Sequence, residues 1–278
     1  MTDRRLTESE IAALKARETE LFKCFISICE KMDLTYYVLG GTLLGAVRHG
    51  GFIPWDDDID VGMPRADYEK FLAGAQALLP DGLFLQTIFT DAGCTSPYAK
   101  IRDGSTTFIE ASVAHVKMHH GVFIDVFPLD FFPSEARERR RFTLRWHLYD
   151  CRIAAEARAK RSVGQQVKRH LLKIAYPSLR RALLRRDRHY KSVSEGSLIA
   201  NLGGAWGERE IMPAEWYGTG TPLRFEGITV NAPTEYKKWL ENVYGDYMRL
   251  PPPEKRVPHH DLAVFDLDRS YLAYMEEK

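Results

Sequence analysis

Apolar residues recur at helical spacing along the first thirty positions of the chain. Thr7 is followed three residues later by Glu10, which is the form of a capping box at the start of a helix. Apolar side chains then return every three or four residues up to about Lys31. The pattern predicts one long amphipathic helix over this stretch, with one face directed toward a core.

Short apolar runs then alternate with helical patterns over the next hundred residues. Two further helices are predicted, over about 42–48 and 67–79. The predicted strands, which are short and rich in β-branched and aromatic residues, cover 36–39, 58–61, 83–89, 98–102, 106–109 and 121–127. This order of elements indicates an α/β (α+β) fold with a mixed sheet flanked by helices.

A helical segment interrupts this order. Three helices are predicted within 134–195, and Pro177 allows the third to begin near Ser178. Mixed structure then resumes, with a strand pair around a turn at Glu226–Gly227 and a helix over about 234–244. We therefore predict one catalytic domain formed by 1–133 and 196–278, with a helical insertion at 134–195.

Charge is distributed unevenly between these parts. The 278 residues include 39 Lys and Arg and 38 Asp and Glu, a formal net charge of +1. The segment 137–191 holds 18 basic and four acidic residues and is therefore +14, which leaves −13 for the rest. The insertion is interpreted as a solvated helical cap, a contact with the anionic inner face of a membrane, or a docking site for an anionic acceptor. No nucleic-acid motif accompanies the charge, so no nucleic-acid partner is expected.

Other bulk features limit the class of protein. No apolar run approaches the roughly 18 residues of a membrane span. The first ten residues lack the apolar region of a secretory signal. The four cysteines lack the spacing of a zinc site or a disulfide framework. The expected location is the cytoplasm, with peripheral contact at the inner face of the membrane.

An acidic run carries the candidate chemistry. Asp58 and Asp60 alternate with apolar residues and are predicted to lie side by side on one face of a strand. Asp125 is an isolated carboxylate within an apolar strand, where an unpaired charge is costly. Oxygen ligands of this kind suit Mg²⁺, with Mn²⁺ as an alternative. Asp56 is predicted to support these residues, and Asp57 to face away.

A glycine pair precedes the acidic run. Gly40, Gly41 and Thr42 lie between a predicted strand and a predicted helix. Glycines there let a phosphate approach the backbone, and the helix N-terminus supplies N–H donors. Two histidine pairs, 119–120 and 259–260, are interpreted as turn histidines or residues near the substrate rather than as a transition-metal site.

The residues from Tyr37 to Val61, YVLGGTLLGAVRHGGFIPWDDDIDV, closely resemble the signature of the LicD family. Further matches occur at Ala99–Arg102, Gly121–Asp130 and Tyr244–Met248. The resemblance covers about residues 20–130 and 215–260. It implies the nucleotidyltransferase fold, in which a Gly-Gly turn is followed by Asp-x-Asp on the next strand and a third acid on a later strand.

The resemblance also implies an activity. LicD enzymes transfer a substituted phosphate, best known as phosphocholine from CDP-choline, to a sugar hydroxyl of a cell-surface glycan or lipid-linked glycan. Related fukutin-type enzymes use CDP-ribitol. By position, Asp58 and Asp60 match the metal-binding pair, Asp125 matches the third acid, and the Gly40–Thr42 turn matches the phosphate side.

The expected reaction is a metal-assisted phosphoryl transfer. Mg²⁺ on the three aspartates would neutralise charge on the leaving CMP, and Asp125 or a neighbouring carboxylate would accept the proton of the acceptor hydroxyl. Arg48, Lys100 and Arg102 are candidate diphosphate ligands. Two alternatives are a nucleotidyltransferase that releases pyrophosphate from an NTP, and an inactive interaction protein of the same fold.

Overall fold

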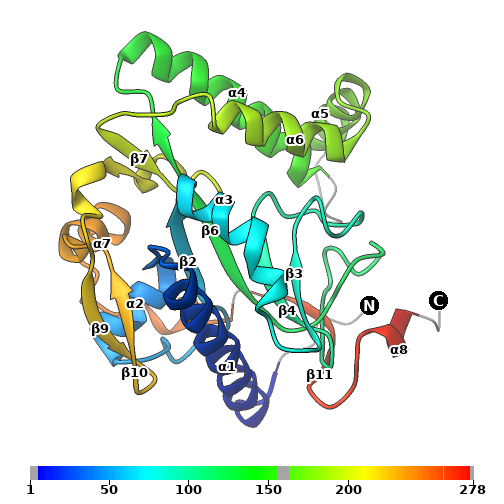
Figure 1. Ribbon diagram of the computed structural model, residues 1–278. Coiled ribbons are helices and arrows are strands. Elements are labelled where there is room, and N and C mark those ends of the chain that lie inside the picture. The colour runs from blue at the N-terminus through cyan, green and yellow to red at the C-terminus, as the bar shows by residue number, and fades with distance from the viewer. Residues whose placement is uncertain (1–5, 156–162, 259, 276–278) are drawn as a thin grey trace.

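A mixed β-sheet forms the centre of the molecule, and helices cover it (Figure 1). The computed structural model describes residues 6–155, 163–258 and 260–275. In order across the sheet, the main strands are β1 (Tyr37–Val38), β2 (Asp60–Pro64), β6 (Phe123–Phe132), β4 (Ala99–Asp103) and β3 (Leu83–Gln86). Strands β2 and β6 run parallel, while β1–β2, β6–β4 and β4–β3 pair antiparallel. The predicted mixed sheet is confirmed.

Strand β6 has two halves with different neighbours. Its first half pairs with β2 and β4, and its second half pairs with β7 (Leu198–Ala200). In turn, β7 pairs with β8 (Ile211–Pro213). The chain that follows the helical insertion thus returns to the same strand that precedes it.

The strand register separates polar from apolar side chains. Asp60 on β2 is paired with Asp125 on β6, which is paired with Lys100 on β4. The next row across the same strands is apolar and consists of Val61, Val126 and Ala99. Because successive side chains of a strand point to opposite faces, the polar row lies on one face and the apolar row on the other.

Helices α1 (Glu8–Met32) and α3 (Arg65–Gly74) bury the apolar face. Phe25 of α1 and Phe71 of α3 are fully buried, with ring centroids 5.4 Å apart. Both belong to the main core that includes the apolar row of the sheet. Burial of each such side chain contributes about 2–3 kcal/mol. The contact between the two rings therefore stabilises the packing of α1 against α3.

Shorter elements complete the fold. They are α2 (Gly40–His49), β5 (Thr107–Glu110), the hairpin β9 (Thr221–Phe225) and β10 (Ile228–Ala232), α7 (Tyr236–Tyr244), β11 (Leu262–Asp266) and α8 (Leu272–Met275). Short 3₁₀ turns cover Ala75–Ala77, Gly207–Glu210, Ala214–Trp216 and Pro253–Lys255. Strand β11 pairs with β5, which brings the C-terminal part of the chain next to the middle of the sequence.

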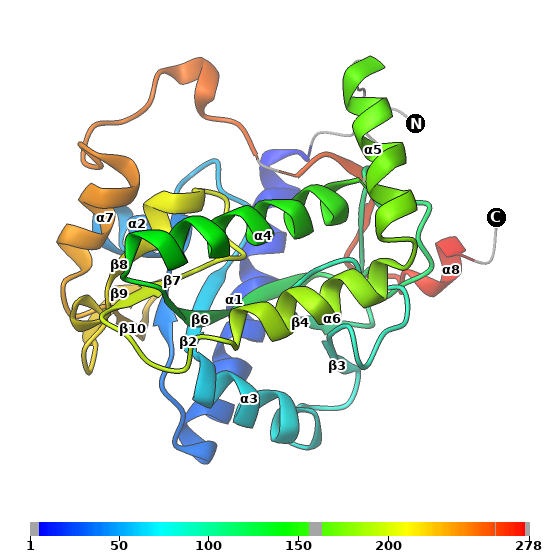
Figure 2. The same cartoon turned by 90° about the horizontal axis from the view of Figure 1, so that it is seen from above.

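The insertion consists of α4 (Ala136–Ala154), α5 (Val163–Ala175) and α6 (Leu179–Tyr190). Helices α4 and α6 lie side by side above the sheet, and α5 lies at their far end (Figures 1 and 2). They form a second small core, whose buried residues are Phe132, Phe142, Trp146, Tyr190, Ala200 and Leu202. This core takes residues from both β6 and β7, so the helices are packed against the sheet rather than tethered to it.

An ion-pair network also fixes the insertion. Arg65 donates from Nε and Nη2 to both carboxylate oxygens of Asp130 on β6, at 2.7 and 2.6 Å. Its Nη1 reaches Asp187 of α6 at 3.1 Å. Lys191 adds contacts to Asp187 and Glu69. One guanidinium thus joins helix α3, strand β6 and helix α6.

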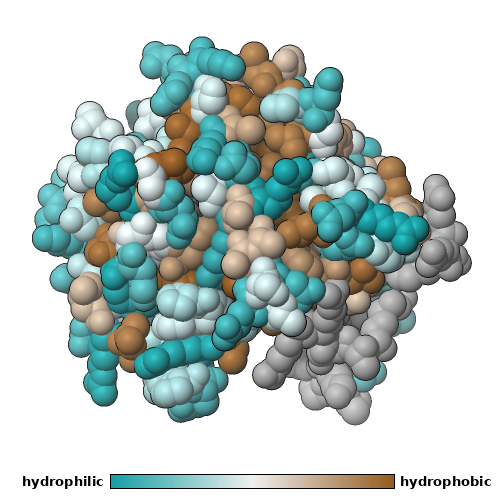
Figure 3. All heavy atoms as spheres, turned by 90° about the horizontal axis from the view of Figure 1, so that it is seen from below, coloured by the Kyte–Doolittle hydropathy of each residue, from teal (hydrophilic) through white to brown (hydrophobic). Residues whose placement is uncertain are grey.

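The side of the molecule away from the three insertion helices exposes both hydrophobic and hydrophilic residues. Figure 3 shows hydrophobic residues between hydrophilic ones on the side away from α4, α5 and α6. Among the described residues, no helix combines the length and the apolar character needed to cross a membrane.

Most elements predicted from the sequence are present. The capping box forms, because Thr7 accepts the Glu10 N–H and the Glu10 carboxylate accepts the Thr7 N–H. The three helices predicted within 134–195 and the hairpin turn are confirmed. Strand β2 begins at Asp60, two residues later than predicted, so Asp58 lies in the segment that leads into it. Strands β7, β8 and β11 were not predicted.

Candidate functional site

The centre of the polar row is a buried ion pair. Nζ of Lys100 lies 2.5 Å from Oδ1 of Asp125, and both side chains are almost fully buried. The ammonium group also lies 3.5 Å from the ring centroid of Phe123. Asp60 is the register neighbour of Asp125 on the parallel strand. Two carboxylates and one cation therefore share one face of adjacent strands.

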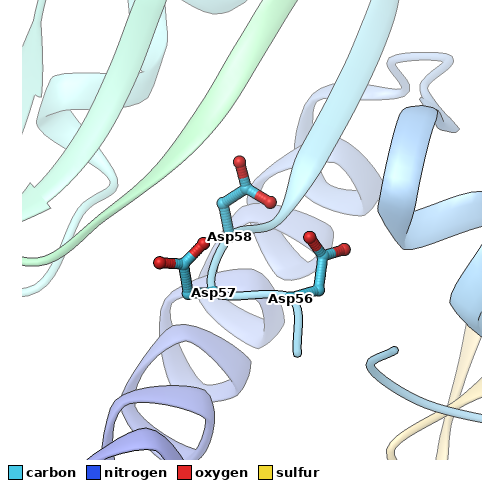
Figure 4. Close-up of side chains that lie close together, drawn as sticks. All are labelled: Asp56, Asp57 and Asp58. Atoms are coloured by element: carbon cyan, nitrogen blue, oxygen red, sulfur yellow. The ribbon is translucent and has the colours of Figure 1, made fainter. Parts of the chain in front are cut away.

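Three more carboxylates converge beside this row. Ligand atoms of Asp56, Asp57 and Asp58 all lie within 4.8 Å of one another. Figure 4 shows the three side chains leaving the short segment that leads into β2. Lys15 of α1 anchors the start of this segment, because Nζ donates to the carbonyl oxygens of Ile53 and Pro54 at 2.9 and 3.0 Å.

The glycine turn at the start of α2 lies directly against these acids. Gly40 has φ +52°, and a Cβ there would lie 2.8 Å from Oδ2 of Asp60. A Cβ on Gly41 would lie 2.2 Å from Oδ2 of Asp56. The Thr42 hydroxyl accepts the Asp60 backbone N–H at 2.8 Å. The turn thus places a helix N-terminus in contact with the carboxylates and orients Asp60.

Crowding of buried carboxylates opposes their ionisation. Burial, together with neighbouring acids, raises the pKa of Asp56 and of Asp58 to about 7. Burial and the charges of Asp58 and Asp125 raise the pKa of Asp60 well above its usual range. Glu18 of α1 is buried beside the same group, and its Oε2 has no hydrogen-bond partner within the described part of the chain. A divalent cation would relieve this repulsion.

His260 closes one side of the acidic group. Its backbone N–H donates to Oδ2 of Asp57 at 3.3 Å, and its Nδ1 lies 3.2 Å from Oδ1. Burial acts to lower the pKa of His260, but the contact with Asp57 and the charges of Asp58 and Glu110 raise it to about 9. Asp57 is therefore paired with a cationic imidazole from the segment that leads into β11.

The three predicted diphosphate ligands have different environments. Arg48 donates from Nη1 to the Tyr247 carbonyl at 2.8 Å, and no residue that the structure describes is a hydrogen-bond partner of its buried Nε. Lys100 is engaged by Asp125. Arg102 is 1% exposed and donates to Gln86 and to the Gly121 carbonyl. The guanidinium of Arg102 is thus hydrogen-bonded inside the sheet, and its contact with a diphosphate stays a prediction.

The acids whose side chains lie closest together in the structure are not the three that the sequence predicted as metal ligands. The predicted metal ligands were Asp58, Asp60 and Asp125, whereas the group with close ligand atoms is Asp56, Asp57 and Asp58. The expectation that Asp57 faces away is wrong, because its side chain is 2% exposed and faces His260. The physical reason is the late start of β2, since residues ahead of the strand do not follow its alternation.

Several residues near the site had no clear signal in the sequence. Burial, together with the charge of Asp125, raises the pKa of Tyr98 well above its usual range. Glu210 accepts the Trp206 backbone N–H at 3.0 Å, and burial raises its pKa to about 7. His260 belonged to a predicted histidine pair, but its partner Asp57 lies 203 positions away. His259 lies outside the described residues.

These residues fit a divalent metal. The donors are carboxylate oxygens, which Mg²⁺ and Mn²⁺ prefer, and their mutual repulsion calls for a positive charge. The adjacent helix N-terminus offers backbone N–H groups toward an anion. A cation held by these carboxylates would lie next to the N-terminus of α2.

The sequence of this chain is similar to a known protein family and to individual proteins. Residues 33–156 match the family described as LicD/FKTN/FKRP, nucleotidyltransferase domain. The lipopolysaccharide cholinephosphotransferase LicD of Haemophilus influenzae is 31% identical over 246 residues, which cover 85% of this chain and 90% of that protein. The similarity therefore covers most of the length of both chains.

Two more distant relatives share parts of the chain. An uncharacterized protein of Rickettsia prowazekii, RP689, is 29% identical over 136 residues, or 48% of this chain and 47% of that protein. The ribitol 5-phosphate transferase FKRP of Homo sapiens is 41% identical over 63 residues, or 22% of this chain and 12% of that protein.

Proposed function

Because the chain belongs to the LicD/FKTN/FKRP nucleotidyltransferase-domain family, we propose that it transfers phosphocholine from CDP-choline to a sugar hydroxyl of a cell-surface glycan or glycolipid. The observation that carries the proposal is 31% identity to a lipopolysaccharide cholinephosphotransferase over 85% of the chain. The transferase class follows from the family. The choline group, the CDP-linked donor and the glycan acceptor are our proposal.

We assign the divalent cation to Asp58, Asp60 and Asp125, with Asp56 as a further carboxylate beside them. Support comes from the register pairing of Asp60 with Asp125 and from the convergence of Asp56 with Asp58. When bound, the cation supplies Lewis-acid stabilisation of charge on the diphosphate. Asp57 is assigned a positioning role, because His260 already neutralises it.

The remaining groups bind the donor and orient the reacting carboxylates. The N-terminus of α2 at Gly40 and Gly41 faces the carboxylates and suits the diphosphate. Arg48 adds a guanidinium whose buried Nε has no partner among the described residues. Lys100 holds Asp125, and Asp125 or an adjacent carboxylate accepts the proton of the acceptor hydroxyl.

A donor screen tests this function. The protein is incubated with Mg²⁺, a glycan acceptor and each of CDP-choline, CDP-ribitol, CDP-glycerol and CDP-ethanolamine, and CMP release is measured. CMP from CDP-choline is expected. Pyrophosphate release in a parallel incubation with an NTP would instead identify a nucleotidyltransferase. No Mg²⁺-dependent turnover with any donor would identify an inactive interaction protein.

A pair of variants tests the site. Asp58→Asn is expected to reduce transfer by about 10³-fold or more while circular dichroism stays unchanged, because a metal ligand is lost. Asp81→Asn, at an exposed turn before β3, is the matched control and should retain full turnover. Full activity of Asp58→Asn would contradict the assignment.

A further inference from the structure

Helix α5 carries an apolar stripe that faces away from the protein. Leu171 and Ile174 are 61% and 67% exposed, and Val167 is more than half exposed. The three positions follow the i, i+4, i+7 spacing that places side chains on one side of a helix. Large apolar side chains usually face a core, so a contiguous exposed stripe indicates a surface that is buried in a complex.

Helix α4 carries a similar stripe mixed with arginine. Leu144 is 64% exposed, and Leu148 follows one turn later and is also exposed. Arg137 and Arg141 are exposed at the same helical spacing on the N-terminal side of these leucines. Two cationic side chains are therefore followed by two apolar ones along one outward face of α4.

Helix α6 adds a purely cationic stripe. Arg181, Arg185 and Arg188 are exposed at i, i+4, i+7 spacing. Two other arginines of the insertion serve the fold instead. Arg152 donates from Nε to the Tyr176 carbonyl at 2.7 Å, and Arg186 binds Asp150 at 2.9 Å. The outward arginines are therefore a distinct set, available to an external partner.

We propose that α4, α5 and α6 bind the surface of an anionic lipid bilayer. In this arrangement Leu171, Ile174 and Leu144 enter the boundary between head groups and acyl chains, and the outward arginines contact the anionic head groups. Helices with exposed apolar side chains and flanking Lys and Arg bind membrane interfaces in this way.

Charge decides between a bilayer and a second copy of the chain. The segment 137–191 is +14, so two copies facing each other through it would bring like charges together. An anionic bilayer attracts the arginines and also accepts the apolar stripe. Nucleic acid would satisfy the charges but leave the exposed leucine and isoleucine side chains in water.

Vesicle sedimentation of the full chain tests the proposal. The protein is mixed with vesicles of phosphatidylglycerol and phosphatidylcholine, or of phosphatidylcholine alone, at low and at high salt. Strong binding to the anionic vesicles, weakened by salt, is expected. Equal binding to both vesicle types, or binding to neither, would overturn the proposal, as would a stable dimer in light scattering that does not bind vesicles.

Two variants separate the apolar and electrostatic parts. Leu171→Ser with Ile174→Ser should weaken binding to anionic vesicles about tenfold or more and leave the salt dependence in place. Arg181→Gln with Arg185→Gln should reduce the salt dependence. Leu272→Ser is the control, because Leu272 is similarly exposed on α8, far from the insertion (Figure 1). Unchanged binding by the first variant would contradict insertion of α5.

The proposal can fail independently of the proposed function. Sedimentation uses no donor or acceptor, and none of the substituted residues touches the carboxylate site. The two α5 substitutions should leave CMP release with a water-soluble acceptor unchanged. Loss of vesicle binding with normal turnover thus reports on α5 alone.

Discussion

Gly41 lies so close to Asp56 that an added Cβ would stand 2.2 Å from its Oδ2 atom. Gly41→Ala must therefore displace either the carboxylate or the first turn of α2. A displacement of about 1 Å at a reacting centre can cost on the order of 10² in rate. We expect Gly41→Ala to lower Mg²⁺-dependent CMP release by about that factor with little change in thermal stability.

Gly164→Ala provides the matched control for this substitution. Gly164 lies in helix α5, and a Cβ there would meet no atom within 4 Å. Alanine favours a helix over glycine by about 1 kcal/mol, so Gly164→Ala should be neutral or slightly stabilising and fully active. Wild-type turnover in Gly41→Ala would show that the close approach has no catalytic importance.

The buried pair of Lys100 and Asp125 should be sensitive to loss of one partner. Lys100→Met leaves the Asp125 carboxylate buried without its cation, which costs about 3 kcal/mol or more. Urea denaturation without metal measures the loss in the free energy of unfolding. The double variant Lys100→Met, Asp125→Asn should recover part of it, because no unpaired charge remains. A single variant as stable as the wild type would refute this account.

Arg65 should be important for the attachment of the insertion. Arg65→Met removes both hydrogen bonds to buried Asp130 and the contact with Asp187, and should cost about 3 kcal/mol in the free energy of unfolding. Lys191→Met breaks partly exposed ion pairs in the same network and should cost less than about 1 kcal/mol. Equal losses for the two variants in chemical denaturation would contradict the special role of Arg65.

His119 should make stability depend on pH. Its ring stacks on Phe84, and its Nδ1 accepts the Gly121 N–H. Burial, aided by the nearby Arg102 charge, lowers the pKa of His119 from its ordinary value of about 6.5 to about 4. As pH falls from 6.5 to 4, His119 becomes protonated in the unfolded chain but stays neutral in the folded chain. The free energy of unfolding therefore falls by up to about 3 kcal/mol.

The contribution of His119 is isolated by substitution. His119→Gln removes the titrating group, so its free energy of unfolding should fall less steeply than that of the wild type between pH 6.5 and 4. Urea denaturation at several pH values measures both slopes. Parallel slopes would show that another group controls the acid sensitivity.

Local sequence patterns were sufficient to predict many of the helices and strands. The Thr7–Glu10 capping box and the periodicity that follows it were sufficient for α1, because both signals relate residues only three or four positions apart. The hairpin at Glu226–Gly227 was equally local, with both turn residues at positive φ. Strand β11 was not predicted, because its pairing with β5 depends on contacts between residues about 150 positions apart.

In the candidate site too, the sequence predicted the features that depend on local patterns and missed those that depend on distant residues. The family signature identified the residue types, and the parallel pairing of β2 with β6 aligns Asp60 with Asp125. The behaviour of Asp57 was predicted wrongly, because its environment depends on His260, which comes from the distant C-terminal segment. The role of Arg102 depended on Gln86 and the Gly121 carbonyl, which no spacing rule connects.

The length of β6 has a consequence for how the molecule is oriented. One uninterrupted strand carries Asp125 at the carboxylate site and Asp130 at the anchor of the insertion. The two residues are separated by about 17 Å along the strand, at roughly 3.3 Å per residue. With no loop between them, the insertion cannot swing over the site as a lid. The insertion is held rigidly relative to the carboxylate site. A surface that binds α4, α5 and α6 would therefore fix the orientation of that site relative to the surface.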